Sequence, residues 1–201
     1  MAFAEKCERV LGVDATSELL DSARREAAQR RIDNVSFVSG DASHLDLADH
    51  SFDVASCRAA FHHFPDPAIV LREMQRVVRP GGKILIADIL GSTDSEKATY
   101  HDRIERLCDP THTRALADAE FDRLLRDAGL QVLHRMTTEI HYEVEEWLAH
   151  GGPSDEAARE IRRLLEASLA HDLSGLKVRR EGDRLKFTHN AVAFLLRTPV
   201  P

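Results

Sequence analysis

The chain has 201 residues, of which 43% are hydrophobic, 30% charged and 5% aromatic, and this is the length and composition of one globular domain. Its net charge of −7 argues against a dedicated nucleic-acid-binding protein, because such proteins present a basic surface. The cysteines form no CxxC pair, no apolar run approaches the ~18 residues of a membrane span, and the N-terminus lacks the apolar core of a signal peptide. We therefore expect a cytoplasmic protein with reduced thiols and neither a nucleic-acid partner nor a membrane span.

The first half of the chain alternates strand-like apolar runs with segments of helical periodicity. Strands are expected over residues 9–14, 35–39, 53–57 and 83–90. A helix should follow Thr16 as its cap and end near Arg30, with an apolar face formed by Leu19, Leu20, Ala23 and Ala27. A second helix should begin after Asp66, with Pro67 in its first position, and end before the Pro-Gly-Gly turn at 80–82. Its predicted inner face is Val70, Leu71, Met74, Val77 and Val78.

The second half predicts two more helices and two more strands. The helices should cover 118–128 and 154–170, and the strands 130–138 and 185–197. The predicted inner faces are Phe121, Leu124 and Leu125 in the first helix and Ile161, Leu164, Leu165 and Leu169 in the second. Strands that alternate with helices are typical of a doubly wound α/β fold with a mostly parallel sheet and helices on both faces. Ligands of such sheets bind at the carboxyl ends of the strands.

Polar residues follow the first two strands at these ends. Asp14 follows the first strand, where a carboxylate can accept hydrogen bonds from the two hydroxyls of a ribose or can simply begin the next helix. Gly40, Asp41 and Ala42 follow the second strand. There the glycine lets a flat ring approach the backbone and the carboxylate can accept from an exocyclic amine, although an ordinary Gly-Asp turn also explains the pair.

Two adjacent histidines follow the third strand. His62 and His63 lie in the segment CRAAFHHFPDP. Neighbouring side chains diverge, and no HExxH motif or carboxylate at ligand spacing accompanies them, so we do not expect a metal site here. An imidazole that lines the pocket and accepts a proton from the substrate is the preferred interpretation, because histidine titrates near neutral pH.

These segments together resemble the class I S-adenosylmethionine-dependent methyltransferases, in particular the small-molecule branch of the ubiquinone/menaquinone-biosynthesis type. The resemblance is carried by VLGVDATSELLDSAR, the SGDA stretch, HSFDVASC with FHHFPDP, and RPGGKILIAD. It is specific over about residues 9–90 and looser over the remainder. It implies a Rossmann-like fold, S-adenosylmethionine as cofactor and a small-molecule methyl acceptor.

The resemblance also implies a role for each matching residue. Asp14 would hold the ribose with Ala15 beside the adenine, and Asp41, after Gly40 and with Ala42, would bind the adenine amine. Cys57 and Arg58 would lie against the methionine part. His62 and His63 would face the methyl acceptor as the first catalytic candidates. His112 is a further candidate for the base, although a position on a surface loop is the preferred interpretation, and Trp147 could line an apolar acceptor pocket but is expected to be a helix anchor.

One departure from the family concerns the chain before Asp14. The family has there a central strand and a glycine-rich E/DxGxGxG turn, and none of the ten glycines of this chain forms such a motif. Residues 1–10 resemble the end of the helix that follows that turn. We expect the reading frame to continue upstream of Met1, so that residues 1–201 form one N-terminally truncated methyltransferase domain; a degenerate relative is the alternative.

The sequence also allows two alternative functions, and residues 142–183 have two possible roles. A nicotinamide-dependent oxidoreductase could also use Asp14, but its Tyr-xxx-Lys pair is missing, since Ile104 follows Tyr100 and Glu146 follows Tyr142 at that spacing. A non-catalytic binding protein that keeps the fold is the second alternative. Residues 142–183 are interpreted as a lid over the pocket or as a contact in a homodimer.

Overall fold

The strands form two sheets in the computed structural model, which describes residues 3–200. β1 (Val10–Asp14) pairs in parallel with β2 (Val35–Ser39). The larger sheet has the order β3-β4-β7-β5, with β6 against β7, and its strands are β3 (Phe52–Arg58), β4 (Val78–Ile89), β5 (Gln131–Glu143), β6 (Arg179–Glu181) and β7 (Arg184–Arg197). β3 and β4 are parallel, and β7 runs antiparallel to β4, β5 and β6. The predicted α/β fold is confirmed.

Six α-helices accompany these strands in the described residues. They are α1 (Ser17–Gln29), α2 (Pro67–Val77), α3 (Ser95–Cys108), α4 (Asp118–Asp127), α5 (Val144–Gly151) and α6 (Asp155–Ala167), and a short 3-10 helix, η1, spans Phe61–His63. The sequence predicted α1, α2, α4 and α6 and missed α3 and α5. None of the helices in residues 3–200 combines the length and the apolarity that a membrane crossing requires.

Several local expectations were wrong. Leu19 is 58% exposed and Leu169 also lies at the surface, so neither belongs to a buried face. Among residues 3–200 the Thr16 side chain has no partner for a capping hydrogen bond; instead its backbone amide donates to Asp14 Oδ1. Residues 3–6 form a turn rather than the end of a helix, and residues 1 and 2 lie outside the described part. β4 begins at Val78, directly after α2, so the Pro-Gly-Gly segment lies within the strand.

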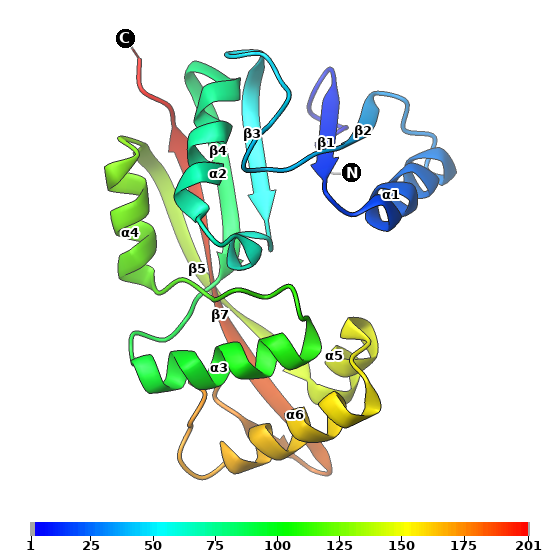
Figure 1. Ribbon diagram of the computed structural model, residues 1–201, viewed down its shortest axis with the longest axis vertical. Coiled ribbons are helices and arrows are strands. Elements are labelled where there is room, and N and C mark those ends of the chain that lie inside the picture. The colour runs from blue at the N-terminus through cyan, green and yellow to red at the C-terminus, as the bar shows by residue number, and fades with distance from the viewer. Residues whose placement is uncertain (1–2, 201) are drawn as a thin grey trace.

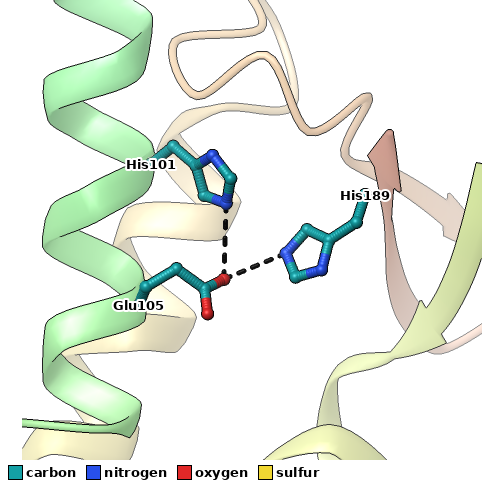
Figure 2. A group of neighbouring side chains, drawn as sticks. All are labelled: His101, Glu105 and His189. Atoms are coloured by element: carbon teal, nitrogen blue, oxygen red, sulfur yellow. Dashed lines mark hydrogen bonds and ion pairs between the residues drawn. The ribbon is translucent and has the colours of Figure 1, made fainter. Parts of the chain in front are cut away.

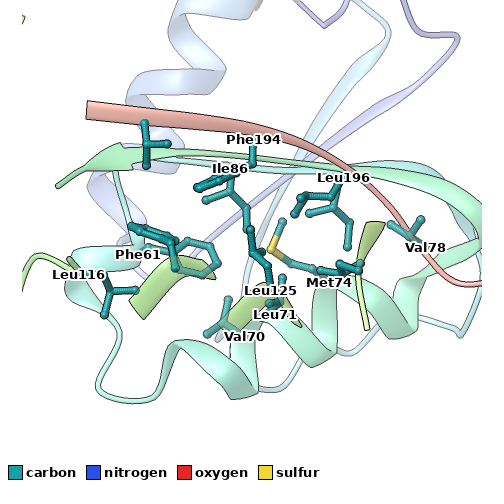
Figure 3. Packing of buried hydrophobic residues seen from close by; sticks show 14 of the residues in the cluster. Phe61, Val70, Leu71, Met74, Val78, Ile86, Leu116, Leu125, Phe194 and Leu196 are labelled. Atoms are coloured by element: carbon teal, nitrogen blue, oxygen red, sulfur yellow. The ribbon is translucent and has the colours of Figure 1, made fainter. Parts of the chain in front are cut away.

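The first hydrophobic core lies between α2, α4 and the sheet (Figure 3). The α2 residues predicted to face inward are all buried, and they pack against Ile84 and Ile86 of β4 and Leu196 of β7. Asp66 begins this helix as predicted, because its side chain accepts hydrogen bonds from the amides of Ala68 and Ile69. The core therefore fixes α2 on β4, and with it the connection from β3 to α2.

A second hydrophobic core lies at the other end of the molecule, where α3, α5 and α6 pack on β7 (Figure 1). Its fully buried members include Ile104, Ile161, Leu165 and Phe187. Trp147 packs edge-on against Phe187 at 5.2 Å between ring centroids, in the helix-anchoring role expected for it. Residues 142–183 thus contribute to this core, while their interpretation as a lid or a dimer contact stays a prediction.

Candidate active site

Asp88, near the end of β4, organises the start of η1. Its side chain is almost wholly buried, at 5% exposure, and Oδ2 accepts hydrogen bonds from the backbone amides of Ala60 at 3.0 Å and Phe61 at 2.6 Å. The other oxygen, Oδ1, lies 2.5 Å from Nδ1 of His62. One carboxylate therefore fixes both the backbone after β3 and the ring of the first predicted histidine.

The contact with Asp88 decides the protonation of His62. A carboxylate only accepts hydrogen bonds, so Nδ1 of the imidazole carries the proton and Nε2 of the neutral ring keeps a free lone pair. Burial lowers the pKa of His62, but the hydrogen bond and charge of Asp88, helped by Glu105 and Asp109, raise it by more, so the net shift is upward. The imidazole of His62 is thus held in one orientation by Asp88, and its Nε2 is the ring nitrogen that can accept a proton.

His63 lies beside His62, with 4.1 Å between the ring centroids. Its Nδ1 is 3.1 Å from the hydroxyl oxygen of Thr111. The segment after α3 wraps around η1, because the amides of Thr113 and Arg114 both donate to the His62 carbonyl oxygen. The two predicted histidines therefore lie together, enclosed by a loop from the second half of the chain.

His112 belongs to the same group, and the expectation of a surface position was wrong. It is only 3% exposed, and its Nε2 lies 2.8 Å from Oδ1 of Asp102 on α3. Its ring centroid is 5.4 Å from that of His62. The carboxylate of Asp102 also accepts the amide of Ala115 and so anchors the loop. Three imidazoles thus gather at the carboxyl ends of β3 and β4.

The residues predicted to bind a nucleoside lie at the carboxyl ends of β1 and β2, where Asp14 is in register with Ser39. One oxygen of Asp14, Oδ1, accepts the Thr16 amide, and Oδ2 makes no hydrogen bond within residues 3–200. Asp41 is exposed, and the amide and hydroxyl of Ser43 lower the pKa of its carboxyl, which keeps it ionised. Both carboxylates accept hydrogen bonds, so they fit the hydroxyls of a ribose and the amine of an adenine, which donate them.

The residues next to these carboxylates have small side chains. A Cβ on Gly40 would come within 2.9 Å of Cγ1 of Val13, so the packing favours glycine at this turn. Ala15 is exposed and Ala42 is half-buried. These small side chains are compatible with a flat ring close to the backbone.

Cys57 and Arg58 end β3, as predicted. Burial, together with the negative charge of Asp88, raises the pKa of the Cys57 thiol to about 12, so it is protonated at neutral pH and is no nucleophile. Arg58 is exposed. The structure thus brings His62 and His63 into one group with Asp88, and places Cys57 and Arg58 at the end of the strand leading to it.

Asp88 and Asp102 were not assigned to the site from the sequence, and His112 was named only as an alternative to His62 and His63. Asp88 carried a usable signal, because it comes at the end of the apolar run KILIAD, just as Asp14 follows RVLGV. Asp102 carried none, since it lies within a helix that was not predicted.

Comparison with known proteins gives the same family from sequence and from structure. Residues 1–86 match the family model described as "Methyltransferase domain". The chain is 30% identical over 196 residues to the uncharacterized methyltransferase YcgJ of Bacillus subtilis, covering 96% of this chain and 77% of that protein. It is 39% identical over 79 residues to the ubiquinone/menaquinone biosynthesis C-methyltransferase UbiE of Bdellovibrio bacteriovorus, covering 39% of this chain and 33% of that protein.

Solved structures extend the similarity over the whole fold. A candidate methyltransferase from Bacillus halodurans superposes with a TM-score of 0.90 at 25% identity, covering 99% of this chain and 87% of that one. The YcgJ crystal structure gives a TM-score of 0.87 at 25% identity, covering 100% of this chain and 86% of that one. The chain therefore belongs to the class I S-adenosylmethionine-dependent methyltransferases.

Proposed function

We propose that the chain transfers the methyl group of S-adenosylmethionine to a small-molecule acceptor from which His62 removes a proton. The observation that carries this proposal is the 2.5 Å contact between His62 Nδ1 and Asp88 Oδ1 at the carboxyl ends of β3 and β4. It leaves His62 Nε2 as a proton acceptor at the edge of the sheet where ligands of α/β folds bind.

Methyl transfer requires the protein mainly to align the acceptor with the cofactor and to remove a proton from the acceptor. S-adenosylmethionine supplies an already activated methyl group. The chain has to orient the acceptor, exclude water and take up the proton of an acceptor that reacts as its anion. We therefore propose an acceptor with an acidic hydroxyl group or an acidic carbon, since such a group reacts as its anion and needs a base to remove the proton.

For the cofactor we propose the residues at the ends of β1 and β2. Asp14 Oδ2 is free to accept a ribose hydroxyl, and the ionised, exposed Asp41 is free to accept the adenine amine. Gly40, Ala15 and Ala42 provide the small side chains around the ring. Cys57 and Arg58 would contact the methionine part from the end of β3.

One substitution tests the proposed role of His62 as the base independently of the proposed cofactor site. Replacement His62→Gln removes the proton acceptor but keeps a polar side chain. With a panel of phenols, quinols and carbon acids as acceptors, turnover, followed as release of S-adenosylhomocysteine, should fall at least about 100-fold, the usual contribution of a general base. The affinity for S-adenosylmethionine, measured by calorimetric titration, should change less than about 2-fold because His62 is not among the proposed cofactor residues.

The alternatives give different results in the same experiment. If His62→Gln retains wild-type turnover, His62 is not the base. If the wild-type protein binds S-adenosylmethionine but methylates no acceptor, the non-catalytic alternative gains support. The exposed His134 provides the matched control. His134→Gln should leave both the turnover and the affinity for S-adenosylmethionine unchanged.

We further propose that the complete protein has a strand between β1 and β3. In residues 3–200, β1 and β2 pair with each other, and no strand ladder joins either of them to β3. An unpaired strand edge leaves backbone groups without hydrogen-bond partners. The form that includes residues encoded upstream of Met1 should bind S-adenosylmethionine more tightly and unfold at higher denaturant concentration than residues 1–201. An in-frame stop codon immediately upstream of Met1 would contradict this proposal.

A further inference from the structure

A second group of polar side chains makes no hydrogen bond, within residues 3–200, to the three imidazoles of the proposed methyl-transfer site. It consists of His101 and Glu105 on α3 and His189 on β7, all of them buried, with exposures of 2%, 9% and 3%. The i, i+4 spacing puts His101 and Glu105 on one face of the helix. Figure 2 shows that this face points at β7 and that the three functional groups point toward one another.

Both histidines present the same atom to the same oxygen. Nε2 of His189 lies 2.9 Å and Nε2 of His101 lies 3.4 Å from Oε1 of Glu105, and the three atoms are all within 4.8 Å of one another. Burial raises the pKa of the Glu105 carboxyl, and its contacts with the two histidines lower it by more, so the carboxylate stays ionised. The result is an anion with two convergent imidazole nitrogens in the interior of the molecule.

Hydrogen bonds within residues 3–200 satisfy this arrangement only in part, because Nε2 of His189 is hydrogen-bonded to Oε1 of Glu105 and Nε2 of His101 is not. The Nε2 atom of His101 is fully buried and has no hydrogen-bond partner, although it is aimed at the carboxylate. A buried polar nitrogen without a partner is unusual in folded proteins. A cation between the three groups would satisfy it, because the lone pair of a neutral imidazole is a metal ligand.

We propose that His101, Glu105 and His189 bind a divalent transition-metal ion of the zinc class. Two imidazoles and one carboxylate are a ligand set that zinc uses, with nitrogen atoms about 2.0–2.1 Å from the ion. Tetrahedral geometry then separates two ligand atoms by about 3.3 Å, close to the 3.4 Å between Glu105 and His101. The distance between Glu105 Oε1 and His189 Nε2, which is 2.9 Å, would have to increase only slightly.

The surroundings of the group favour binding of an ion over solvation of the side chains. The rings of Tyr142 and Phe187 lie 5.2 Å and 5.1 Å from that of His189, so the outer face of this ligand is apolar. An apolar surround strengthens the electrostatic attraction between an ion and its ligands. Because α3 also supplies Asp102, an ion here would fix on β7 the same helix that anchors the loop around His62.

The test measures metal binding and needs no methyl acceptor. The untagged chain is freed of metal with a chelator and titrated with Zn²⁺, and with Co²⁺ as a spectroscopic substitute. We expect one ion per chain, visible absorption typical of tetrahedral Co²⁺ with nitrogen and oxygen ligands, and a thermal unfolding midpoint that rises with Zn²⁺ concentration.

Variants identify the ligands. Glu105→Gln keeps the shape of the side chain but removes its negative charge. His189→Gln removes one of the two proposed nitrogen ligands. Each should weaken Zn²⁺ binding by more than about 100-fold, since changes even outside the ligand shell cost 10–100-fold. The exposed His134→Gln should bind as the wild type does.

Three results would overturn the proposal. The first is a wild-type chain that neither retains an ion nor gains thermal stability with Zn²⁺, which would make the group a buried ion pair. The second is a thiolate-to-cobalt charge-transfer band, which would place the ion on cysteine. The third is unchanged affinity in folded Glu105→Gln. If the variants do not fold, the wild-type spectrum and stoichiometry decide alone. Since no step involves methyl transfer, failure here leaves the proposed function untouched.

Discussion

The two oxygens of Asp88 have separable tasks. Oδ2 accepts the amides of Ala60 and Phe61 and so shapes the backbone after β3, whereas Oδ1 contacts His62 and accepts the amide of Ile89. A side chain of the same shape but without charge can keep the first task and lose the second. This property makes Asp88 the most informative residue to change.

We expect Asp88→Asn to lower turnover by at least about 100-fold and to move its pH dependence. Histidine is active as a base only when neutral, and Asp88 raises the pKa of His62 above its ordinary value of 6.5. The acidic limb of the kcat/KM profile should therefore lie above pH 6.5 in the wild type and shift to lower pH in the variant. NMR titration of the His62 ring protons checks the assignment. An acidic limb that stays in place would show that His62 is not the titrating base.

Asp14 offers a residue-scale test of the cofactor site. Loss of a charge-assisted hydrogen bond costs about 1.5–3 kcal/mol, so Asp14→Ala should weaken S-adenosylmethionine binding by about 10- to 100-fold. Calorimetric titration measures the affinity directly. Asp46, exposed and without a hydrogen bond or ion pair among the described residues, is the matched control. Equal affinities of Asp14→Ala and Asp46→Ala would remove Asp14 from the proposed site.

At the scale of elements, α2 depends on its first turn. The Asp66 side chain accepts the Ala68 amide at 2.9 Å and the Ile69 amide at 3.4 Å. Asp66→Ala should lower the free energy of unfolding by about 1 kcal/mol, the usual cost of losing a helix cap. Chemical denaturation measures this value. Asp46→Ala, at the surface outside any helix, should change it by less than about 0.5 kcal/mol.

The contrast between α2 and α3 shows which elements a sequence predicts well. α2 combines a capping aspartate, a proline in the first turn and an apolar stripe, and all three signals agree. α3 buries His101 and Glu105 on its inner face, so its hydrophobic period is interrupted where the helix contacts the sheet. Pattern reasoning fails there because the buried residues are polar.

The candidate site was predictable to a similar extent. His62, Asp14 and Asp41 each follow a predicted strand. Because ligands of α/β sheets bind at the carboxyl ends of the strands, the sequence alone singled out these residues. His112 could not be placed, because its burial results from Asp102 on α3 and from a loop that returns across η1. Contacts between segments distant in the chain leave no periodic signal in either one.

At the scale of the whole molecule, β7 belongs to both hydrophobic cores. Phe187 near its start is buried in the second core, and Phe194 and Leu196 near its end are buried in the first. A single hydrogen-bonded strand thus connects packing at the two ends of the molecule. Unfolding of one core should expose the other.

The single tryptophan makes this expectation measurable. Trp147 reports on the second core through its contact with Phe187. Ile84→Ala in the first core should destabilise by about 2–5 kcal/mol and should lower the denaturation midpoint of Trp147 fluorescence together with that of far-ultraviolet circular dichroism. If the fluorescence midpoint of the variant stays at the wild-type value, the two cores unfold separately.

The ladder between β5 and β7 also limits how the two ends of the molecule can move relative to each other. Its pairs run from Gln131 with Arg197 to Glu143 with Lys186, past the junction of both cores. Bending the two ends of the molecule apart would break the hydrogen bonds between these residue pairs. The ladder therefore holds the two ends rigidly together and does not act as a hinge. If the site proposed around His62 opens and closes, we expect the movement in parts outside the ladder, such as the segment carrying Thr111 and His112 that covers η1.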